Sequence, residues 1–179
     1  MKTLTFLLLL TLIVPLDSSL SVQTKPSTTQ IPDEVMKAEF RSVTGSSLIT
    51  LAADKGSVVV VALWATWCGP CRLAIKELNS VNKDFVGRGV KVVGLTTQDP
   101  TQIEGVQAFL SEYNVNFAVA WVEAEHAKVL LGDRDAIPQI LVLAGDGSVA
   151  KRFVGWNRKQ TTPVLREAIE KALITAAAK

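Results

Sequence analysis

Hydrophobic residues follow two alternating spacings along most of this chain. Continuous apolar runs, which are typical of buried strands, cover residues 58–63, 90–95, 117–122 and 140–143. Between these runs, apolar residues recur three or four positions apart, which predicts amphipathic helices from about 70, from about 100 to 113 and from about 123 to 131. Because Gly87 and Gly89 follow the first helical pattern, we expect that helix to end there. The order β-α-β-α-β-α predicts an α/β domain.

The C-terminal part of the chain has a different pattern. Two short apolar segments, 140–143 and 148–154, flank the sequence Gly145-Asp146-Gly147, which predicts an antiparallel hairpin. A closing helix follows, for which Thr161 is the expected N-cap and Pro163 lies near the first turn. A β-α-β unit is thus followed by a β-β-α unit.

The first residues are typical of an exported protein. Lys2 precedes an apolar run from Leu4 to Leu16, which is shorter than the roughly 20 residues that span a bilayer, and small residues follow it. We interpret residues 1–21 as a signal peptide, with an uncleaved anchor as the alternative. Residues 22–37 are rich in Ser, Thr, Gln and Pro, which predicts a flexible spacer, and the folded domain is expected over 38–179.

Length and charge limit the number of domains and the kinds of partner that the chain can have. The chain has 179 residues and 48% hydrophobic content, enough for one well-packed domain. Its formal charge of +2 gives no support to nucleic-acid binding, so we expect no nucleic acid among its partners.

The only two cysteines, Cys68 and Cys71, lie at the corner between the first strand and the first helix. Unpaired N–H groups and the positive end of the helix dipole stabilise a thiolate there, so Cys68 is the expected nucleophile. Cys71, one turn later, is the expected resolving thiol. Pro70 suits the opening of a helix, and Gly69 lets a partner approach the backbone.

Other uses of this pair fit less well. A zinc site needs about four ligands, and two cysteines and His126 do not supply them. Covalent haem attachment needs a histidine where Arg72 stands. A structural disulfide across so short a loop stabilises by only about 2 kcal/mol. We therefore expect neither a metal nor a bound cofactor beyond the Cys68–Cys71 disulfide itself. His126 is not expected to act as a catalytic base.

The sequence Trp-Ala-Thr-Trp-Cys-Gly-Pro-Cys-Arg, residues 64–72, resembles the active-site motif of the thioredoxin superfamily. The preceding run of valines is similar to that of its secreted TlpA/ResA-like branch, and the likeness extends from about Ala38 to about Ala172. The resemblance implies a thioredoxin fold: a central mixed sheet flanked by helices, β-α-β then β-β-α, with an inserted αβα segment between Gln98 and Arg134. It also implies a periplasmic protein-disulfide reductase.

Further expectations follow from this resemblance. It implies a cis bond between Ile137 and Pro138, with the Ile137 backbone pairing with an extended client segment, and Trp67 contacting partners. The clients are protein disulfides, in this branch often those of cytochrome c maturation. Electrons are expected from a membrane thiol transporter resembling DsbD or CcdA, and the protein is expected to be a monomer.

Three positions depart from the family pattern. Ala62 and Ala74 stand where thioredoxins and many TlpA/ResA-like proteins carry an acid, and Lys76 replaces a helix-kinking proline. Deprotonation of Cys71 then depends on water, on a residue that the sequence does not identify, or on Glu77 or Lys76 if they reach it. A non-catalytic thioredoxin-fold binding module is the alternative that these losses favour. A peroxiredoxin-type peroxidase is a more distant alternative. Such enzymes carry a threonine two or three residues before the reactive cysteine, and Thr66 resembles it weakly.

Overall fold

The computed structural model of the protein describes residues 30–53 and 56–178. In chain order its helices and strands are α1 (Asp33–Lys37), β1 (Phe40–Arg41), β2 (Leu48–Ile49), β3 (Val58–Trp64), α2 (Gly69–Phe85), β4 (Val90–Thr96), α3 (Ile103–Glu112), β5 (Ala118–Trp121), α4 (Ala124–Leu131), β6 (Gln139–Ala144), β7 (Val149–Val154) and α5 (Arg158–Ala177). Short 3-10 turns lie at Val86–Arg88 and Pro100–Gln102. The β-α-β-α-β-α order and the C-terminal hairpin are as predicted.

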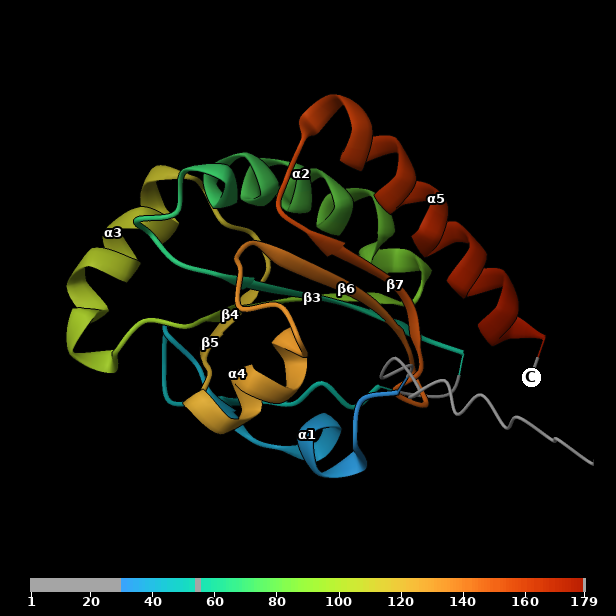
Figure 1. Ribbon diagram of the computed structural model, residues 1–179, viewed down its shortest axis with the longest axis horizontal. Helices are drawn as coiled ribbons and strands as arrows, with labels where there is room; N and C mark the ends of the chain where they lie inside the picture. The colour runs from blue at the N-terminus through green and yellow to red at the C-terminus, as the bar shows by residue number, and fades with distance from the viewer. Residues whose placement is uncertain (1–29, 54–55, 179) are drawn as a thin grey trace, which may run out of the picture.

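Five strands form the central mixed sheet in the order β5-β4-β3-β6-β7 (Figure 1). The middle strand β3 is parallel to β4 and antiparallel to β6, and all seven of its residues are buried. A strand that is covered on both faces needs apolar side chains on both, which explains the uninterrupted run Val58 to Leu63 in the sequence. β5 extends the sheet beyond β4 and belongs to the inserted segment, together with α3 and α4.

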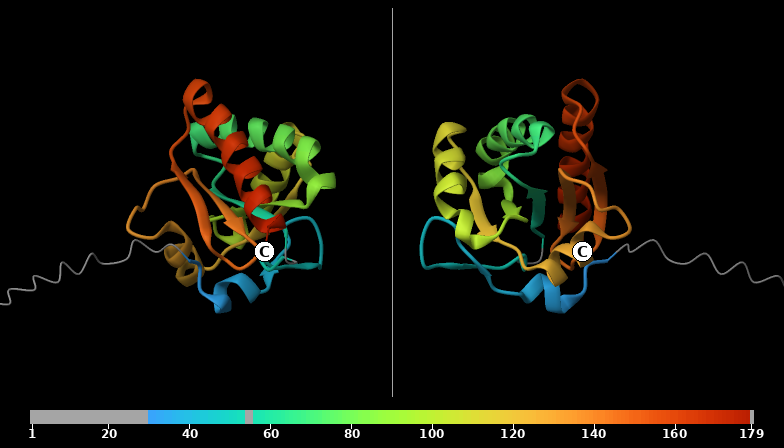
Figure 2. Two further views of the ribbon diagram at one scale, coloured as in Figure 1. Left: turned by 90° about the vertical axis from the view of Figure 1, so that its right-hand side faces the viewer. Right: turned by 60° about the vertical axis from the view of Figure 1, so that its left-hand side comes forward.

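Helices cover both faces of the sheet, as Figures 1 and 2 show. α2 and α5 pack on one face, against alternate residues of β3 such as Val58 and Val60. α1 and α4 pack on the opposite face, against Val59, Val61 and Leu63. The thioredoxin fold that the sequence predicts is thus present, with its inserted αβα segment.

A third apolar cluster lies between α2, α3 and the ends of β3 and β5. It contains both cysteines, and Trp64 and Phe109 meet in it with ring centroids 5.0 Å apart. The inserted segment therefore supplies part of the wall behind the cysteines.

The folded domain begins earlier than predicted. Residues 30–37, which we expected to belong to the flexible spacer, include the buried side chains of Ile31, Val35 and Met36 and the helix α1. The Ile31 amide donates to the carbonyl of Gly147 at 2.9 Å, which attaches this segment to the turn between β6 and β7. The spacer prediction is therefore wrong for residues 30–37. The predicted signal peptide, residues 1–21, and residues 22–29 lie outside the described residues.

The start of the closing helix also differs from the prediction. α5 begins at Arg158, and its N-cap is Asn157, whose side-chain oxygen accepts from the amides of Lys159 and Gln160. Thr161 lies inside the helix, and its hydroxyl accepts from the Asn157 amide at 3.1 Å. Asparagine is as good an N-cap as threonine, so the earlier of two adequate caps starts the helix.

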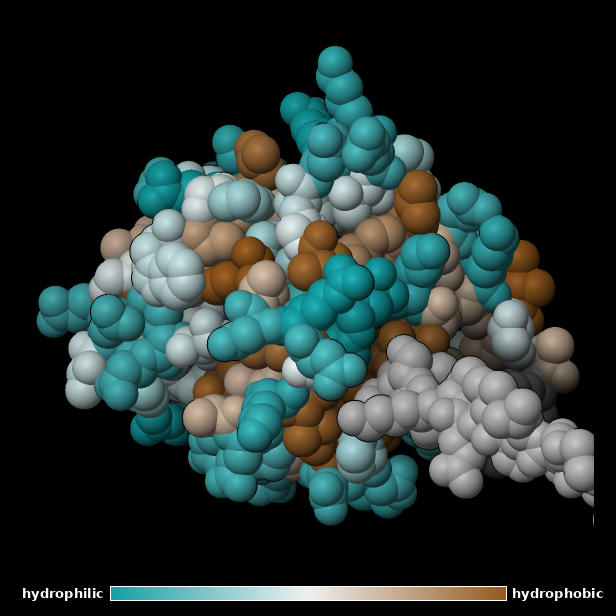
Figure 3. Space-filling model, viewed as in Figure 1, coloured by the Kyte–Doolittle hydropathy of each residue, from teal (hydrophilic) through white to brown (hydrophobic). Residues whose placement is uncertain are grey.

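The face seen in Figure 3 is largely hydrophilic, with separate hydrophobic patches between the polar groups. Among the described residues, no helix combines the length and the apolar character needed to cross a bilayer. Large exposed hydrophobic side chains include Trp67, which is 69% exposed.

Candidate active site

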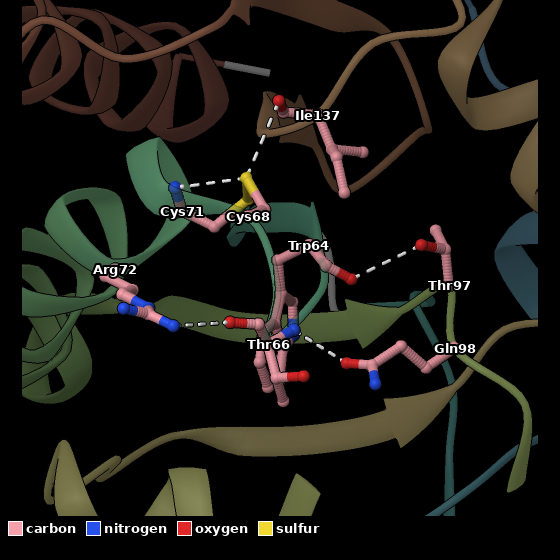
Figure 4. Close-up of a disulfide and its surroundings, with 8 residues drawn as sticks. All are labelled: Trp64, Thr66, Cys68, Cys71, Arg72, Thr97, Gln98 and Ile137. Atoms are coloured by element: carbon pink, nitrogen blue, oxygen red, sulfur yellow. Dashed lines mark hydrogen bonds between the residues drawn. A yellow bond between two sulfur atoms is a disulfide. The ribbon is translucent and has the colours of Figure 1, made fainter. Parts of the chain in front are cut away.

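Cys68 and Cys71 form a disulfide where β3 gives way to α2, with their Cα atoms 5.2 Å apart (Figure 4). Cys68 is the N-cap of α2, and its sulfur accepts from the Cys71 amide at 3.2 Å. Gly69 and Pro70 are the first two residues of the helix, as expected. The Cys68 sulfur therefore takes the capping position that an oxygen fills in most helices, where it faces unpaired N–H groups.

The two sulfurs differ in access. Cys68 is 5% exposed, whereas Cys71 is fully buried in the cluster behind the helix. An incoming disulfide can therefore reach Cys68 first. This arrangement agrees with the roles predicted for the two thiols, which remain predictions.

Ile137 lies beside the cysteines although it is remote in sequence. The Cys68 sulfur is 3.7 Å from the Ile137 carbonyl oxygen (Figure 4). The Ile137–Pro138 bond is cis, as predicted, and the Pro138 carbonyl accepts from the Gly155 amide at 2.8 Å. Within the described residues the Ile137 amide has no hydrogen-bond partner, so it is available to an extended chain.

The turn before Cys68 is held by hydrogen bonds that the sequence did not point to. The Thr66 amide donates to Gln98 Oε1 at 2.6 Å, and the Thr66 carbonyl accepts from Arg72 Nη2 at 3.3 Å. The Thr97 amide donates to the Trp64 carbonyl at 3.0 Å. Figure 4 shows the bonds from Thr66 to Gln98 and Arg72 on the side of the turn away from Ile137, together with a bond from the Thr97 hydroxyl to the Trp64 carbonyl at 3.5 Å. No local pattern indicates the contacts of Gln98 and Thr97, because they join residues 32 and 33 positions apart.

Trp67 and Ile137 line one groove, together with Gln98 and residues of β1 and α4. Ile137 is half-buried and Trp67 projects from the surface. The groove therefore begins beside the Cys68 sulfur and runs toward the inserted segment.

A second network holds the loop that leads to Pro138. Gln139 is fully buried, and its Nε2 donates to the carbonyls of Leu131 and Arg134 at 3.2 and 2.6 Å. Arg152 Nη1 donates to Gln139 Oε1 at 2.7 Å and to the Leu130 carbonyl at 2.5 Å. Burial lowers the pKa of Arg152 from its ordinary value. Its charge lies at the C-terminus of α4, where the helix dipole favours a cation.

The positions of the two missing acids are filled by methyl groups. Ala62 and Ala74 are both buried in the apolar cluster under α2 and α5. Glu77 is paired with Arg166 of α5 at 2.9 Å, and Lys76 lies over the Tyr113 ring, 5.6 Å from its centroid. Both of these candidate proton acceptors are thus engaged away from Cys71.

The remaining candidates of the sequence analysis lie outside the disulfide site. His126, on α4, packs edge-on against Phe40 with ring centroids 5.6 Å apart and lies 3.8 Å from Glu123. Trp121 is buried, and Trp156 is packed against the core cluster that contains α2 and α5. In the part of the chain that the structure describes, no group of three His, Cys, Asp or Glu side chains could hold a metal ion.

Curated relatives carry names that match this chemistry. The chain is 27% identical over 114 residues to the thiol-disulfide oxidoreductase ResA of Bacillus cereus, which covers 63% of each chain. It is 28% identical over 112 residues to ResA of Bacillus subtilis, covering 63% of this chain and 61% of that one. The chain thus spans a little under two thirds of these relatives.

Solved structures share the fold. A thiol:disulfide interchange protein of the thioredoxin family from Chlorobium tepidum matches with a TM-score of 0.67 and 25% identity, covering 81% of this chain and 96% of that one. A secreted disulfide oxidoreductase from Mycobacterium tuberculosis matches with a TM-score of 0.63 and 20% identity, covering 78% and 99%, and supports the fold alone.

The family model that matches this chain is Redoxin, over residues 26–169. The match includes the disulfide, the Ile137–Pro138 loop and the inserted segment, and it agrees with the ResA relatives. The chain belongs to the Redoxin family and is a ResA-like member of the thioredoxin superfamily.

Proposed function

We propose that this protein is an exported thiol-disulfide oxidoreductase that reduces disulfides in other proteins. The observation that carries the proposal is the Cys68–Cys71 disulfide at the N-terminus of α2, with the Cys68 sulfur facing the Ile137 carbonyl. The names of the ResA relatives support the same chemistry. The Gly-Pro pair between the cysteines is that of reducing thioredoxins, which favours reduction as the direction.

The reaction uses two thiol exchanges. The Cys68 thiolate attacks one sulfur of the client disulfide, forms a mixed disulfide, and releases the other client sulfur as a thiolate that takes up a proton. The Cys71 thiolate then attacks the Cys68 sulfur. This step restores the Cys68–Cys71 disulfide and releases the second client thiol. The buried position of Cys71, one turn along α2, places it behind the sulfur that it must attack.

The Ile137 loop and Trp67 provide the client platform. An extended client segment pairs with the backbone amide of Ile137, which has no partner among the residues that the structure describes, and this brings the client disulfide to Cys68. Trp67 covers the other side of the segment with an exposed aromatic surface. Protein thiols and disulfides are therefore the proposed substrates, and no metal or bound cofactor takes part.

Export accounts for the need for a reductant. Residues 1–21 have the composition of a signal peptide. In an oxidising compartment the disulfide form accumulates, so a membrane thiol transporter of the DsbD or CcdA kind is the proposed electron donor. The protein acts as a monomer.

Export is tested by fusing residues 1–37 to alkaline phosphatase, because that enzyme is active only outside the cytoplasm. An inactive fusion would contradict export.

Catalysis is tested with the reduction of insulin disulfides by dithiothreitol. The rate is measured as the increase in turbidity when the reduced insulin precipitates. The full-length chain should accelerate the reaction, and Cys68→Ser should lower the rate to that of dithiothreitol alone. If wild type and Cys68→Ser give the same rate of insulin reduction, the protein is better explained as a non-catalytic binding module. Rapid consumption of hydrogen peroxide without a protein disulfide would favour a peroxidase instead.

A further inference from the structure

The backbone of Thr66 is held at both ends by side chains from different elements. Gln98 Oε1 accepts from its amide at 2.6 Å, and Arg72 Nη2 donates to its carbonyl at 3.3 Å. Gln98 is 9% exposed, and its Nε2 donates to Gln102 Oε1 at 3.1 Å. The glutamine is thus fixed by its own partner and presents its oxygen to the turn.

The turn that Gln98 holds carries the exposed aromatic ring beside Cys68. Trp67 follows Thr66 directly, and with 69% of its surface exposed it has few contacts of its own to fix it. Its placement therefore depends on the backbone that precedes it. Gln98, Trp67 and Ile137 line the same groove, so a shift of the turn would change the width of the groove at the disulfide.

We propose that Gln98 is a positioning residue for protein substrates. By fixing the Thr66 amide, it holds Trp67 at the distance from Ile137 that an extended client segment requires. The inference rests on the proposed function, because it concerns how a client disulfide reaches Cys68. It concerns the client platform and not the thiol chemistry. Gln98 therefore controls the reaction with proteins and leaves the reaction with small disulfides unchanged.

The test compares two substrates with the full-length chain in its dithiol form. Insulin is the protein disulfide, and 5,5′-dithiobis(2-nitrobenzoic acid) is the small one. Gln98→Ala leaves the Thr66 amide without its partner, and we expect kcat/KM for insulin to fall about tenfold. The rate with the small disulfide should stay within about twofold, because the Cys68 thiolate is intact.

A double-mutant cycle tests whether Gln98 acts through Trp67. Trp67→Ala should also lower the insulin rate, and the variant with both substitutions should be no slower than Trp67→Ala alone. Gln98→Glu keeps an oxygen acceptor, and the Gln102 amide can turn to donate to it. This conservative change should therefore restore the insulin rate.

Gln107→Ala is the matched control. It removes a glutamine bond to a backbone carbonyl, from Gln107 Nε2 to Val43 at 3.0 Å, away from the turn. Both rates should be unchanged in this variant. If Gln98→Ala does not fold, Gln98→Met removes the acceptor while keeping the volume and should give the same two rates.

Two results would overturn the proposal. One is an equal fall of both rates in Gln98→Ala, which would mean a general loss of structure or of thiol reactivity. The other is a double variant whose loss is the product of the two single losses, which would mean that Gln98 and Trp67 act independently. If the wild-type chain reduces neither substrate, the proposed function itself fails, so the two failures are distinguishable.

Discussion

The sulfur of Cys68 lies 3.7 Å from the carbonyl oxygen of Ile137, although 69 positions separate the two residues. A disulfide sulfur has no proton to donate, so this contact can become a hydrogen bond only when Cys68 is a thiol. In a mixed disulfide the Cys68 sulfur would be bonded to a client sulfur, and the Ile137 carbonyl would lie beside that bond. The relationship therefore joins the nucleophile to the backbone that receives the client.

The order of the two thiol steps gives the first prediction. Cys71→Ser should accumulate a mixed disulfide between Cys68 and the client, because the attacking thiol survives and the resolving thiol is lost. Non-reducing electrophoresis after incubation with a denatured disulfide protein measures this adduct. Cys68→Ser should form none. An adduct that forms equally in Cys68→Ser would show that Cys71 is the attacking thiol.

Gly94 of β4 gives a prediction about packing behind the site. A Cβ atom there would lie 3.0 Å from Phe117 Cε2 and 3.1 Å from Trp64 Nε1. Gly94→Ala should therefore lower the free energy of unfolding by about 1–3 kcal/mol, because the core is overpacked. Urea denaturation followed by tryptophan fluorescence measures it.

Gly105 is the matched control for that substitution. It lies in α3 and has nothing within 4 Å of its added Cβ atom. Gly105→Ala should raise the free energy of unfolding by about 0.5–1 kcal/mol through helix propensity. Equal effects of the two alanines would contradict the packing around Trp64.

The Arg152 network gives a prediction about the Pro138 loop. Arg152→Met removes the charged donor from Gln139 Oε1 and from the Leu130 carbonyl. We expect a loss of about 2 kcal/mol, which corresponds to a fall in Tm of about 4–8 °C for a domain of this size. Lys151→Met, at an exposed neighbouring position, should change stability by at most about 0.5 kcal/mol. Similar shifts in the two variants would rule out the network as a stabilising element.

Lys91 gives a prediction about pH. Burial lowers its pKa below the ordinary value of 10.5, and its ammonium donates to the Thr50 carbonyl at 2.6 Å. Between the lowered and the ordinary pKa the unfolded chain binds more protons than the folded one, so the contribution of Lys91 to stability rises with pH in that window. The unfolding free energy of wild type minus that of Lys91→Met should therefore rise as the pH is raised toward 10.5. A difference that shrinks with pH would contradict it.

Local patterns were sufficient for the core of the fold. The run Val58 to Leu63 predicted a buried strand because both faces of β3 are covered, and the spacing after Pro70 predicted α2 because only one face of that helix is buried. The cysteine spacing placed the disulfide at the corner between them. These features depend on residues close in sequence, which is why the sequence reveals them.

Features that depend on distant contacts were missed. The segment 30–37 follows a stretch rich in Ser, Thr, Gln and Pro and was assigned to the spacer with it, yet Ile31 and Met36 are buried because they pack against an apolar face of the sheet. The bond from Thr66 to Gln98 and the donation from Arg152 to Gln139 both join separate elements, and no local pattern indicates them. These polar side chains make their hydrogen bonds because the fold brings distant segments together, and their residue types alone do not indicate this.

The reduction potential of the Cys68–Cys71 pair tests the central claim most directly. The full-length chain is equilibrated with dithiothreitol or glutathione buffers, and the thiol fraction is measured by alkylation after acid quenching. A protein-disulfide reductase of the thioredoxin kind should give a value near or below about −250 mV. A value above about −180 mV would contradict the reducing direction and indicate an oxidase or isomerase.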